Sequence, residues 1–141
     1  MGCVHVDITL TNLFLKKSFQ VHALVDTGAF LMVIPPSMAT GLGFDLEEMS
    51  ARMVTLADGS QTLRPCVPLE VKWQDRTTSC DAMVLGDQCM VGVLALEGMG
   101  LVVDPVQQRV IPNPKHPNGP ILFAAMSAML DLLSKREPPA A

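Results

Sequence analysis

Short apolar runs, separated by turn-forming residues, constrain the fold of this chain more than any other feature of its sequence. Residues 4–10 alternate apolar and polar side chains with a period of two, which is typical of a half-buried strand. Similar short runs recur along the chain, and eleven prolines and ten glycines punctuate it. Few segments show the longer periodicity of an amphipathic helix. The pattern therefore predicts a β-rich fold with short helices.

The same pattern predicts where individual elements begin and end. Residues 11–18 carry polar side chains and predict a turn, and Asp58-Gly59 predicts the tip of a hairpin. Ser37 is expected to cap a short helix that ends near Leu42, and Gly100 is expected to stop a second helix over residues 94–99. The expected strands are residues 4–10, 19–25, 30–34, 52–57, 60–66, 67–73, 77–85, 101–104 and 109–111.

Length and charge exclude several classes of protein. The 141 residues suffice for one domain with a core, and 49% apolar residues exclude wholesale disorder. The net charge of -4 argues against nucleic acid as the main partner, because phosphate binding needs a basic face. There is no apolar run of the ~20 residues that span a membrane, and no signal peptide is recognisable. We therefore expect a cytoplasmic protein without an integral membrane segment.

The four cysteines do not form a recognisable metal site. No two of the cysteines are spaced as a C-x-x-C pair, and the three histidines are scattered singly. The cysteines are Cys3, Cys66, Cys80 and Cys89. In a cytosolic chain such thiols are expected to stay reduced and to behave as small apolar residues. We expect no metal.

One segment points to chemistry. Leu24 and Val25 lead into Asp26-Thr27-Gly28, and the small residue Ala29 follows. Taken alone, three such residues indicate only a turn, but here the aspartate stands at the end of an apolar strand.

The segment resembles the active-site motif of aspartic proteases, and specifically of the retropepsin-like family with one Asp-Thr/Ser-Gly motif per half-size chain. Residues 19–34 look like the catalytic segment of that family, 52–65 like its flap hairpin, and 90–100 like the apolar-apolar-Gly and helix that close its ψ-shaped loop. Residues 91–114 resemble the bacterial single-domain type most closely. The resemblance implies an all-β fold with a closed retropepsin-like barrel, one short helix after the ψ-loop glycine and an extra C-terminal helix.

The resemblance implies catalytic roles for Asp26, Thr27 and Gly28. Hydrolysis by an aspartic protease needs two carboxyls about 3 Å apart that share one proton, so that one activates water while the other acts as the acid. Asp26 is the single aspartate of this chain in the right setting, so the second carboxyl is expected from another copy. The chemistry thus predicts a homodimer. Thr27 would bond across the dimer axis, and Gly28 would let the backbone approach the carboxylate. No cofactor is implied.

A polypeptide substrate is the partner that the family implies. The hairpin tip would fold over an extended peptide and exclude water. Retroviral proteases carry an ion pair of Asp and Arg where this chain has Phe30 and Val93, so we expect an apolar contact there, with Phe30 narrowing the pocket. The residues expected to bind the substrate are Ala29, Phe30, Ala57, Asp58, Gly59, Val91 and Gly92.

Three regions are expected along the chain. Residues 1–114 form the protease domain, 115–120 a proline-rich linker, and 121–141 an amphipathic helix and tail. The helix, over residues 121–136, could dock a partner, lie on a membrane surface or regulate the site, although packing on the protein's own dimer is favoured. On one of its faces lie Leu122, Met126, Met129 and Leu133.

Two classes of function follow from this sequence. The first is a homodimeric aspartic endopeptidase, which its own C-terminal helix could hold inactive. The second is a non-catalytic dimeric module that binds peptides or other proteins and retains the fold. Turnover of peptides distinguishes the two.

Overall fold

The computed structural model describes residues 3–119, so the predicted helix over 121–136 lies outside the described part. Nine strands and two short helices form within residues 3–119. In chain order they are β1 (His5–Asn12), β2 (Lys17–Val25), β3 (Met32–Ile34), α1 (Pro36–Gly41), β4 (Ala51–Thr55), β5 (Gln61–Trp73), β6 (Arg76–Val84), β7 (Met90–Val91), α2 (Val93–Met99), β8 (Leu101–Asp104) and β9 (Arg109–Pro112). Neither helix is long and apolar enough to cross a membrane.

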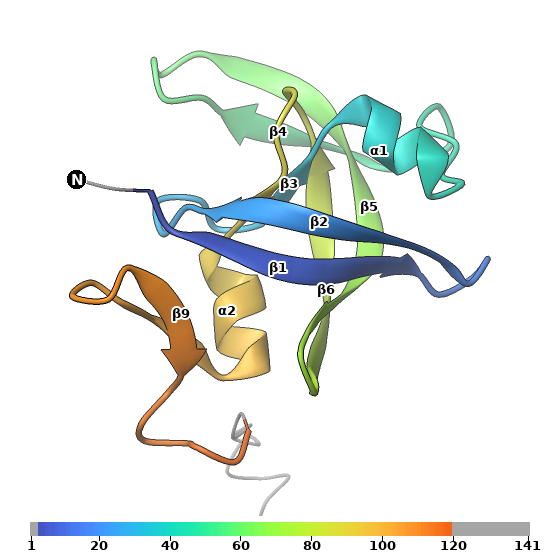
Figure 1. The fold of residues 1–141 in the computed structure, drawn as a ribbon. Helices are drawn as coiled ribbons and strands as arrows, with labels where there is room; N and C mark the ends of the chain where they lie inside the picture. The colour runs from blue at the N-terminus through green and yellow to red at the C-terminus, as the bar shows by residue number, and fades with distance from the viewer. Residues whose placement is uncertain (1–2, 120–141) are drawn as a thin grey trace, which may run out of the picture.

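Six of the strands form a ring. Their hydrogen-bonded order is β1-β2-β7-β3-β6-β5, and β5 pairs back with β1 (Figure 1). The pairs β2–β7 and β3–β6 are parallel, whereas the other pairs of the ring are antiparallel. β4 pairs with the first part of β5 and stands outside the ring, and β8 and β9 form a separate hairpin. The predicted all-β fold is confirmed, with a sheet that closes on itself.

Apolar side chains from alternate strand positions form the core. Val6, Ile8 and Leu10 of β1 are buried, whereas His5 and Asp7 are exposed and Thr9 is half-buried, which confirms the predicted period of two. The largest fully buried side chains are Leu10, Met32, Ile34, Leu42, Met99, Val67, Val71, Val84 and Val91.

The helix α2 packs against β5, β6 and β8, with Ala95, Leu96 and Met99 buried. Gly100 follows it with a φ of 68°, and its N–H donates to the carbonyl of Glu97 at 3.0 Å. This left-handed conformation costs other residues about 1–2 kcal/mol, so the glycine specifies where the helix ends. The predicted stop at Gly100 is confirmed.

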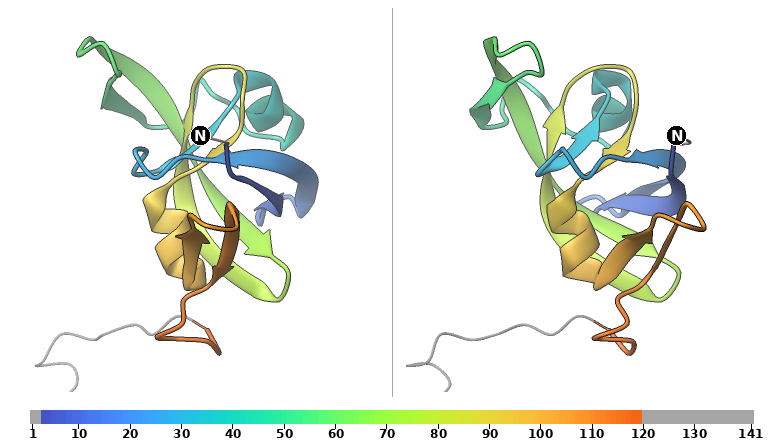
Figure 2. Two further views of the ribbon diagram at one scale, coloured as in Figure 1. Left: turned by 60° about the vertical axis from the view of Figure 1, so that its left-hand side comes forward. Right: turned by 90° about the vertical axis from the view of Figure 1, so that its left-hand side faces the viewer.

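Two segments far apart in the sequence project from one side of the ring. Figure 2 shows the β4–β5 hairpin and the loop between β2 and β3 on the same side in both views. The hairpin extends well beyond the ring, because β4 lies outside it and β5 is long enough to serve both the hairpin and the ring. The two runs expected as separate strands, 60–66 and 67–73, are therefore the single strand β5.

The predicted turn over residues 11–18 is wrong in its extent. β1 and β2 continue toward each other as far as Asn12 and Lys17, so the turn is limited to residues 13–16. The hydroxyls of Thr11 and Ser18 lie 2.8 Å apart and bond across the strands. Polar side chains that indicated a turn are thus cross-strand partners in the sheet.

Two further expectations around residues 30–37 are wrong. Phe30 was expected in a buried strand, but β3 begins at Met32 and the Phe30 side chain is 66% exposed. Ser37 was expected to cap α1, but the N-cap is Pro35 and no side chain provides the cap. Pro36 begins the helix because its fixed φ suits the first turn and its missing N–H would have no partner there.

Candidate active site

Asp26 lies directly after β2, and β7 fixes its position. Leu24 and Val25 pair in parallel with Met90 and Val91. The backbone N–H of Asp26 extends this ladder by donating to the carbonyl of Val91 at 3.0 Å. A half-buried carboxylate therefore stands where the strand leaves the sheet.

The turn after Asp26 folds back on its carboxylate. The N–H of Gly28 donates to Oδ1 of Asp26 at 2.9 Å, and the N–H of Ala29 donates to the Asp26 carbonyl at 3.1 Å. A Cβ at Gly28 would lie 3.1 Å from the same Oδ1, so a side chain there would crowd the carboxylate. Glycine is needed here for close approach rather than for an unusual backbone angle.

The junction between β7 and α2 crosses directly over this loop. A Cβ at Gly92 would lie 2.8 Å from the carbonyl oxygen of Ala29 and closer still to that of Leu31. The N–H of Val93 donates to the Ala29 carbonyl at 2.9 Å, and the N–H of Leu94 to the Phe30 carbonyl at 3.1 Å. Loop carbonyls thus take the place of a side-chain cap at the start of α2.

These contacts bring together the predicted catalytic segment, residues 19–34, and the predicted ψ-loop segment, residues 90–100. Asp26, Thr27, Gly28, Ala29 and Phe30 form one loop, and Val91 and Gly92 lie against it. The expected apolar contact between the Phe30 and Val93 side chains stays a prediction.

The hairpin tip carries the remaining predicted residues. Gly59 has a φ of 85°, and the N–H of Leu56 donates to the Ser60 carbonyl at 2.8 Å, which confirms the turn predicted at Asp58-Gly59. Oδ1 of Asp58 accepts hydrogen bonds from the Ser60 hydroxyl at 2.6 Å and its N–H at 2.9 Å. These bonds hold the pKa of Asp58 below its ordinary value, the hydroxyl having the larger effect. Ala57, Asp58 and Gly59 are exposed on the tip and apart from the Asp26 loop.

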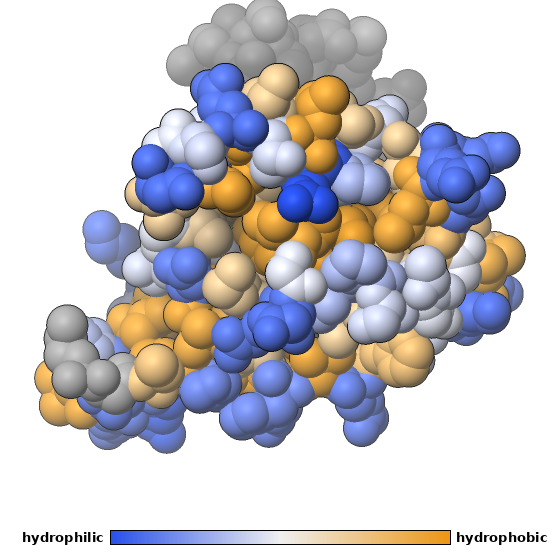
Figure 3. Space-filling view, turned by 90° about the horizontal axis from the view of Figure 1, so that it is seen from above, coloured by the Kyte–Doolittle hydropathy of each residue, from blue (hydrophilic) through white to orange (hydrophobic). Residues whose placement is uncertain are grey.

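The hairpin also presents apolar side chains that sequence reasoning missed. Met53 of β4 and Leu63 of β5 face each other across the strands and are 59% and 61% exposed, whereas their neighbour Val54 is buried. Figure 3 shows the end of the molecule that carries this hairpin, where hydrophobic side chains gather between hydrophilic ones. Met53 and Val54 are adjacent apolar residues on a strand, so they point to opposite faces, but the sequence could not tell which of the two is exposed.

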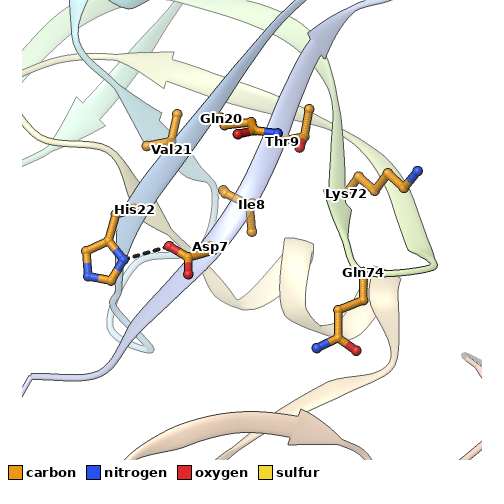
Figure 4. A pocket seen from close by; sticks show the side chains of 8 residues that line it. All are labelled: Asp7, Ile8, Thr9, Gln20, Val21, His22, Lys72 and Gln74. Atoms are coloured by element: carbon orange, nitrogen blue, oxygen red, sulfur yellow. Dashed lines mark hydrogen bonds and ion pairs between the residues drawn. The ribbon is translucent and has the colours of Figure 1, made fainter.

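A hollow of about 660 Å³ lies elsewhere, on the outer face of β1 and β2 next to the end of β5 (Figure 4). Exposed polar side chains dominate its lining, and Nδ1 of His22 lies 2.7 Å from Oδ1 of Asp7. None of the predicted site residues lines it, so it is not part of the candidate site.

No group of three or more histidine, cysteine or acidic side chains that could hold a metal occurs in the described part of the chain. The cysteines are free thiols. Burial raises the pKa of Cys80 to about 11 and that of Cys89 to about 12. Both thiols are therefore protonated at neutral pH, which makes them poor nucleophiles and poor ligands.

Comparisons with known proteins identify the family and the fold of this chain. Residues 15–99 match the family described as gag-polyprotein putative aspartyl protease. The fold is similar to that of a retropepsin-like aspartic protease from Rickettsia conorii, with 23% identity and a TM-score of 0.58 over 73% of this chain and 77% of that one. It is also similar to the retroviral protease-like domain of Ddi1 from Leishmania major, with 16% identity and a TM-score of 0.55 over 87% and 96% of the two chains.

A comparison with curated proteins gives no match. At such low identities the two structural likenesses show the fold alone. They confirm the retropepsin-like fold that the sequence predicts.

Proposed function

Because this chain belongs to the family of gag-polyprotein putative aspartyl proteases, we propose that it is an aspartic endopeptidase that acts as a homodimer, with Asp26 of each copy in one catalytic pair. The observation that carries the proposal is the placement of Asp26, half-buried at the end of β2 and hydrogen-bonded to Val91 and Gly28. We assign the activity to residues 1–114, which include every element from β1 to β9.

In the proposed reaction the two carboxyls share one proton. The ionised carboxyl takes a proton from the attacking water, while the protonated one donates to the carbonyl oxygen of the scissile bond. The N–H of Gly28 supports the ionised oxygen, and the bond from the Asp26 amide to Val91 keeps the carboxylate in place. As the tetrahedral intermediate collapses, the carboxyl that took the proton from water donates it to the leaving nitrogen and the C–N bond breaks, while the other carboxylate takes back the proton from the intermediate's hydroxyl.

The need for a second copy follows from the single Asp-Thr-Gly in the chain. Thr27 and Gly28 are exposed beside the half-buried Asp26, so the loop is open toward solvent in one copy. We propose that the same loop of a second copy covers it and that Thr27 hydroxyls bond between the two loops. One chain would then hold half of a site.

We propose further that the β4–β5 hairpin acts as the flap over a bound polypeptide. Its tip and the Asp26 loop project from the same side of the ring (Figure 2). The exposed pair Met53 and Leu63, together with Phe30 on the loop, would give the substrate channel an apolar lining. Peptides with large apolar side chains near the scissile bond fit such a lining.

Hydrolysis of a mixed peptide library tests the proposal. Wild-type protein should cleave peptides, and Asp26→Asn should lower the rate at least about a hundredfold, because an amide cannot act as the base. The asparagine oxygen can still accept the bond from Gly28, so this variant should remain folded. Asp75→Asn, at the exposed β5–β6 turn, is the matched control and should retain full activity.

Two outcomes would contradict the proposal. Unchanged hydrolysis by Asp26→Asn would remove this residue from the reaction. Peptides that bind to the wild type without turnover would instead favour the non-catalytic, peptide-binding alternative.

A further inference from the structure

The turn between β1 and β2 exposes three large apolar side chains. Leu13, Phe14 and Leu15 are all exposed, and Phe14 reaches 82%. Tight turns ordinarily carry small and polar residues, because their side chains face water. Three adjacent exposed apolar residues therefore indicate a contact surface rather than a solvated turn.

Hydrogen bonds hold this turn in place. The N–H of Phe14 donates to Oδ1 of Asn12 at 3.1 Å. The Asn12 side chain is itself only 2% exposed, and its Nδ2 donates to the carbonyl of Leu42 at 2.9 Å. The buried Asn12 amide, which makes both of these hydrogen bonds, fixes the start of the turn. Phe14 is therefore held outside the core.

A hollow of about 360 Å³, which we call the apolar groove, adjoins the turn. Leu13 and Phe14 form one wall of the groove, and the strands β5 and β6 supply the rest. The other lining residues are Pro68, Leu69, Ser79, Cys80 and Asp81. The turn lies far from the tip of the β4–β5 hairpin, at the other side of the molecule in Figure 1.

The described part of the chain ends against the β5–β6 turn, and β6 leads from that turn to the groove. Nη2 of Arg76 donates to the carbonyl of Pro117 at 2.6 Å, which fixes residues near the end of the described chain against the β5–β6 turn. A hollow of about 350 Å³ at the same place is lined by residues 75–77 and 117–119. Ser79, which lines the groove, is two residues beyond Thr77 on β6, a distance of about 7 Å along the strand.

The remaining chain has the length and chemistry to fill the groove. Residues 120–141 follow Gly119, and a helix over 121–136 would be about 24 Å long. Attachment to the same molecule gives this segment a high effective concentration at the groove, which a separate partner would lack. Its sequence places Leu122, Met126, Met129 and Leu133 at helical spacing, with Lys135 and Arg136 near its end. Asp81 also lines the groove, but it is paired with Arg52 at 3.1 Å, so apolar contact rather than charge is the match that the groove offers.

We propose that residues 121–136 dock in the apolar groove of their own chain, with their apolar face against Leu13 and Phe14. This docking does not depend on the proposed catalysis, because the groove lies outside the Asp26 loop. The groove shares Pro68 and Asp81 with a hollow at the base of the β4–β5 hairpin, so the docked segment would contact the strands that carry this hairpin.

Double-mutant cycles on the full chain test the proposal. Phe14→Ala is combined in turn with an alanine substitution at each of four segment positions, and the unfolding equilibrium is measured in urea. If Phe14 contacts the segment, at least one double variant should change the unfolding equilibrium constant at least about threefold less than the product of the changes caused by its two single substitutions. Phe14 is exposed in residues 3–119, so its substitution should leave the core folded. The four segment positions are Leu122, Met126, Met129 and Leu133.

Val106→Ala provides the matched control, because Val106 is 88% exposed on the β8–β9 turn and does not line the groove. It should show no coupling to any segment position. Coupling of Phe14 to at least one position, unchanged on dilution, would support the proposal. Absence of coupling at all four positions would overturn it. Coupling that disappears on dilution would overturn it as well, because the groove would then hold the segment of a second copy.

Discussion

The backbone amide of Asp26 donates a 3.0 Å hydrogen bond to the carbonyl of Val91, although the two residues belong to segments far apart in the sequence. Gly92 follows Val91 and lies against the carbonyls of Ala29 and Leu31. The loop that carries the carboxylate and the start of α2 therefore form one backbone-bonded unit. Substitutions that separate them should alter the candidate site even when they touch no carboxylate.

The closest contact in this unit leads to a prediction for Gly92→Ala. The added methyl group would collide with backbone carbonyls, which cannot turn aside as a side chain could. We expect a loss of about 3 kcal/mol in the free energy of unfolding in urea, together with most peptide hydrolysis. Gly86→Ala is the control, since Gly86 has open space and a φ of 72° and should cost about 1 kcal/mol with activity retained. Equal losses for the two variants would contradict the packing argument.

A shared site makes an inactive chain an inhibitor of the active one. With a tenfold excess of Asp26→Asn chain, most wild-type chains would pair with an inactive copy, and the hydrolysis rate should fall to about a tenth. The rate of wild type alone should fall faster than linearly on dilution for the same reason. The measurement is the initial rate after subunit exchange, with sedimentation to follow the dimer. If the added variant leaves the hydrolysis rate unchanged, a single chain is sufficient for catalysis.

How far the sequence predicted this structure depends on whether local pattern or distant contacts decided each element. The period of two in residues 4–10 and the glycine at position 100 act locally, and both predictions are confirmed. The run 30–34 is different, because the carbonyls of Ala29 and Phe30 bond to the start of α2 and so the loop continues to Leu31. A local sequence pattern carries no information about a partner as distant in the chain as the start of α2.

The candidate site shows the same division. The Asp-Thr-Gly sequence indicated the loop, and its neighbourhood with Val91 and Gly92 came from the resemblance to a family rather than from periodicity. Met53 and Leu63 were missed, because the adjacent apolar residues Met53 and Val54 point to opposite faces of the strand and the sequence does not say which face meets the core. The exposed side became evident only from the position of β4 outside the ring.

Acid should weaken the turn at the hairpin tip, because it protonates the Asp58 carboxylate. Hydrogen bonds from Ser60 lower the pKa of this carboxyl, so their contribution to the tip is present above the ordinary value of 3.8 and is lost as the pH falls through the lowered value. A carbon NMR titration should show the pKa of Asp58 return toward 3.8 in Ser60→Ala. Ser79→Ala, an exposed serine on β6, should leave it unchanged. If Ser60→Ala does not move the titration, the bond from the Ser60 hydroxyl is absent in solution.

Met53→Ser should change substrate preference without changing stability. Its side chain is largely exposed, so the free energy of unfolding should stay within about 0.5 kcal/mol of wild type. If the hairpin covers the substrate, kcat/KM for peptides with large apolar side chains should fall about tenfold. Peptides with small side chains should be affected less. Val106→Ser, on the exposed β8–β9 turn, is the control, and an equal effect of both variants on kcat/KM would remove Met53 from the substrate channel.

The dependence of the rate on pH tests the shared proton itself. At low pH both carboxyls of the proposed pair are protonated, so no base is available to activate water. At high pH both are ionised, so no acid remains and the two like charges repel each other. The rate should therefore be bell-shaped with its maximum on the acidic side of neutrality. The measurement is the initial rate on one peptide from about pH 3 to about pH 9, with folding and dimerisation followed at each pH so that their loss is not mistaken for titration. A rate that rises steadily through about pH 8, or that depends on added zinc, would identify another catalytic group and contradict the proposed pair.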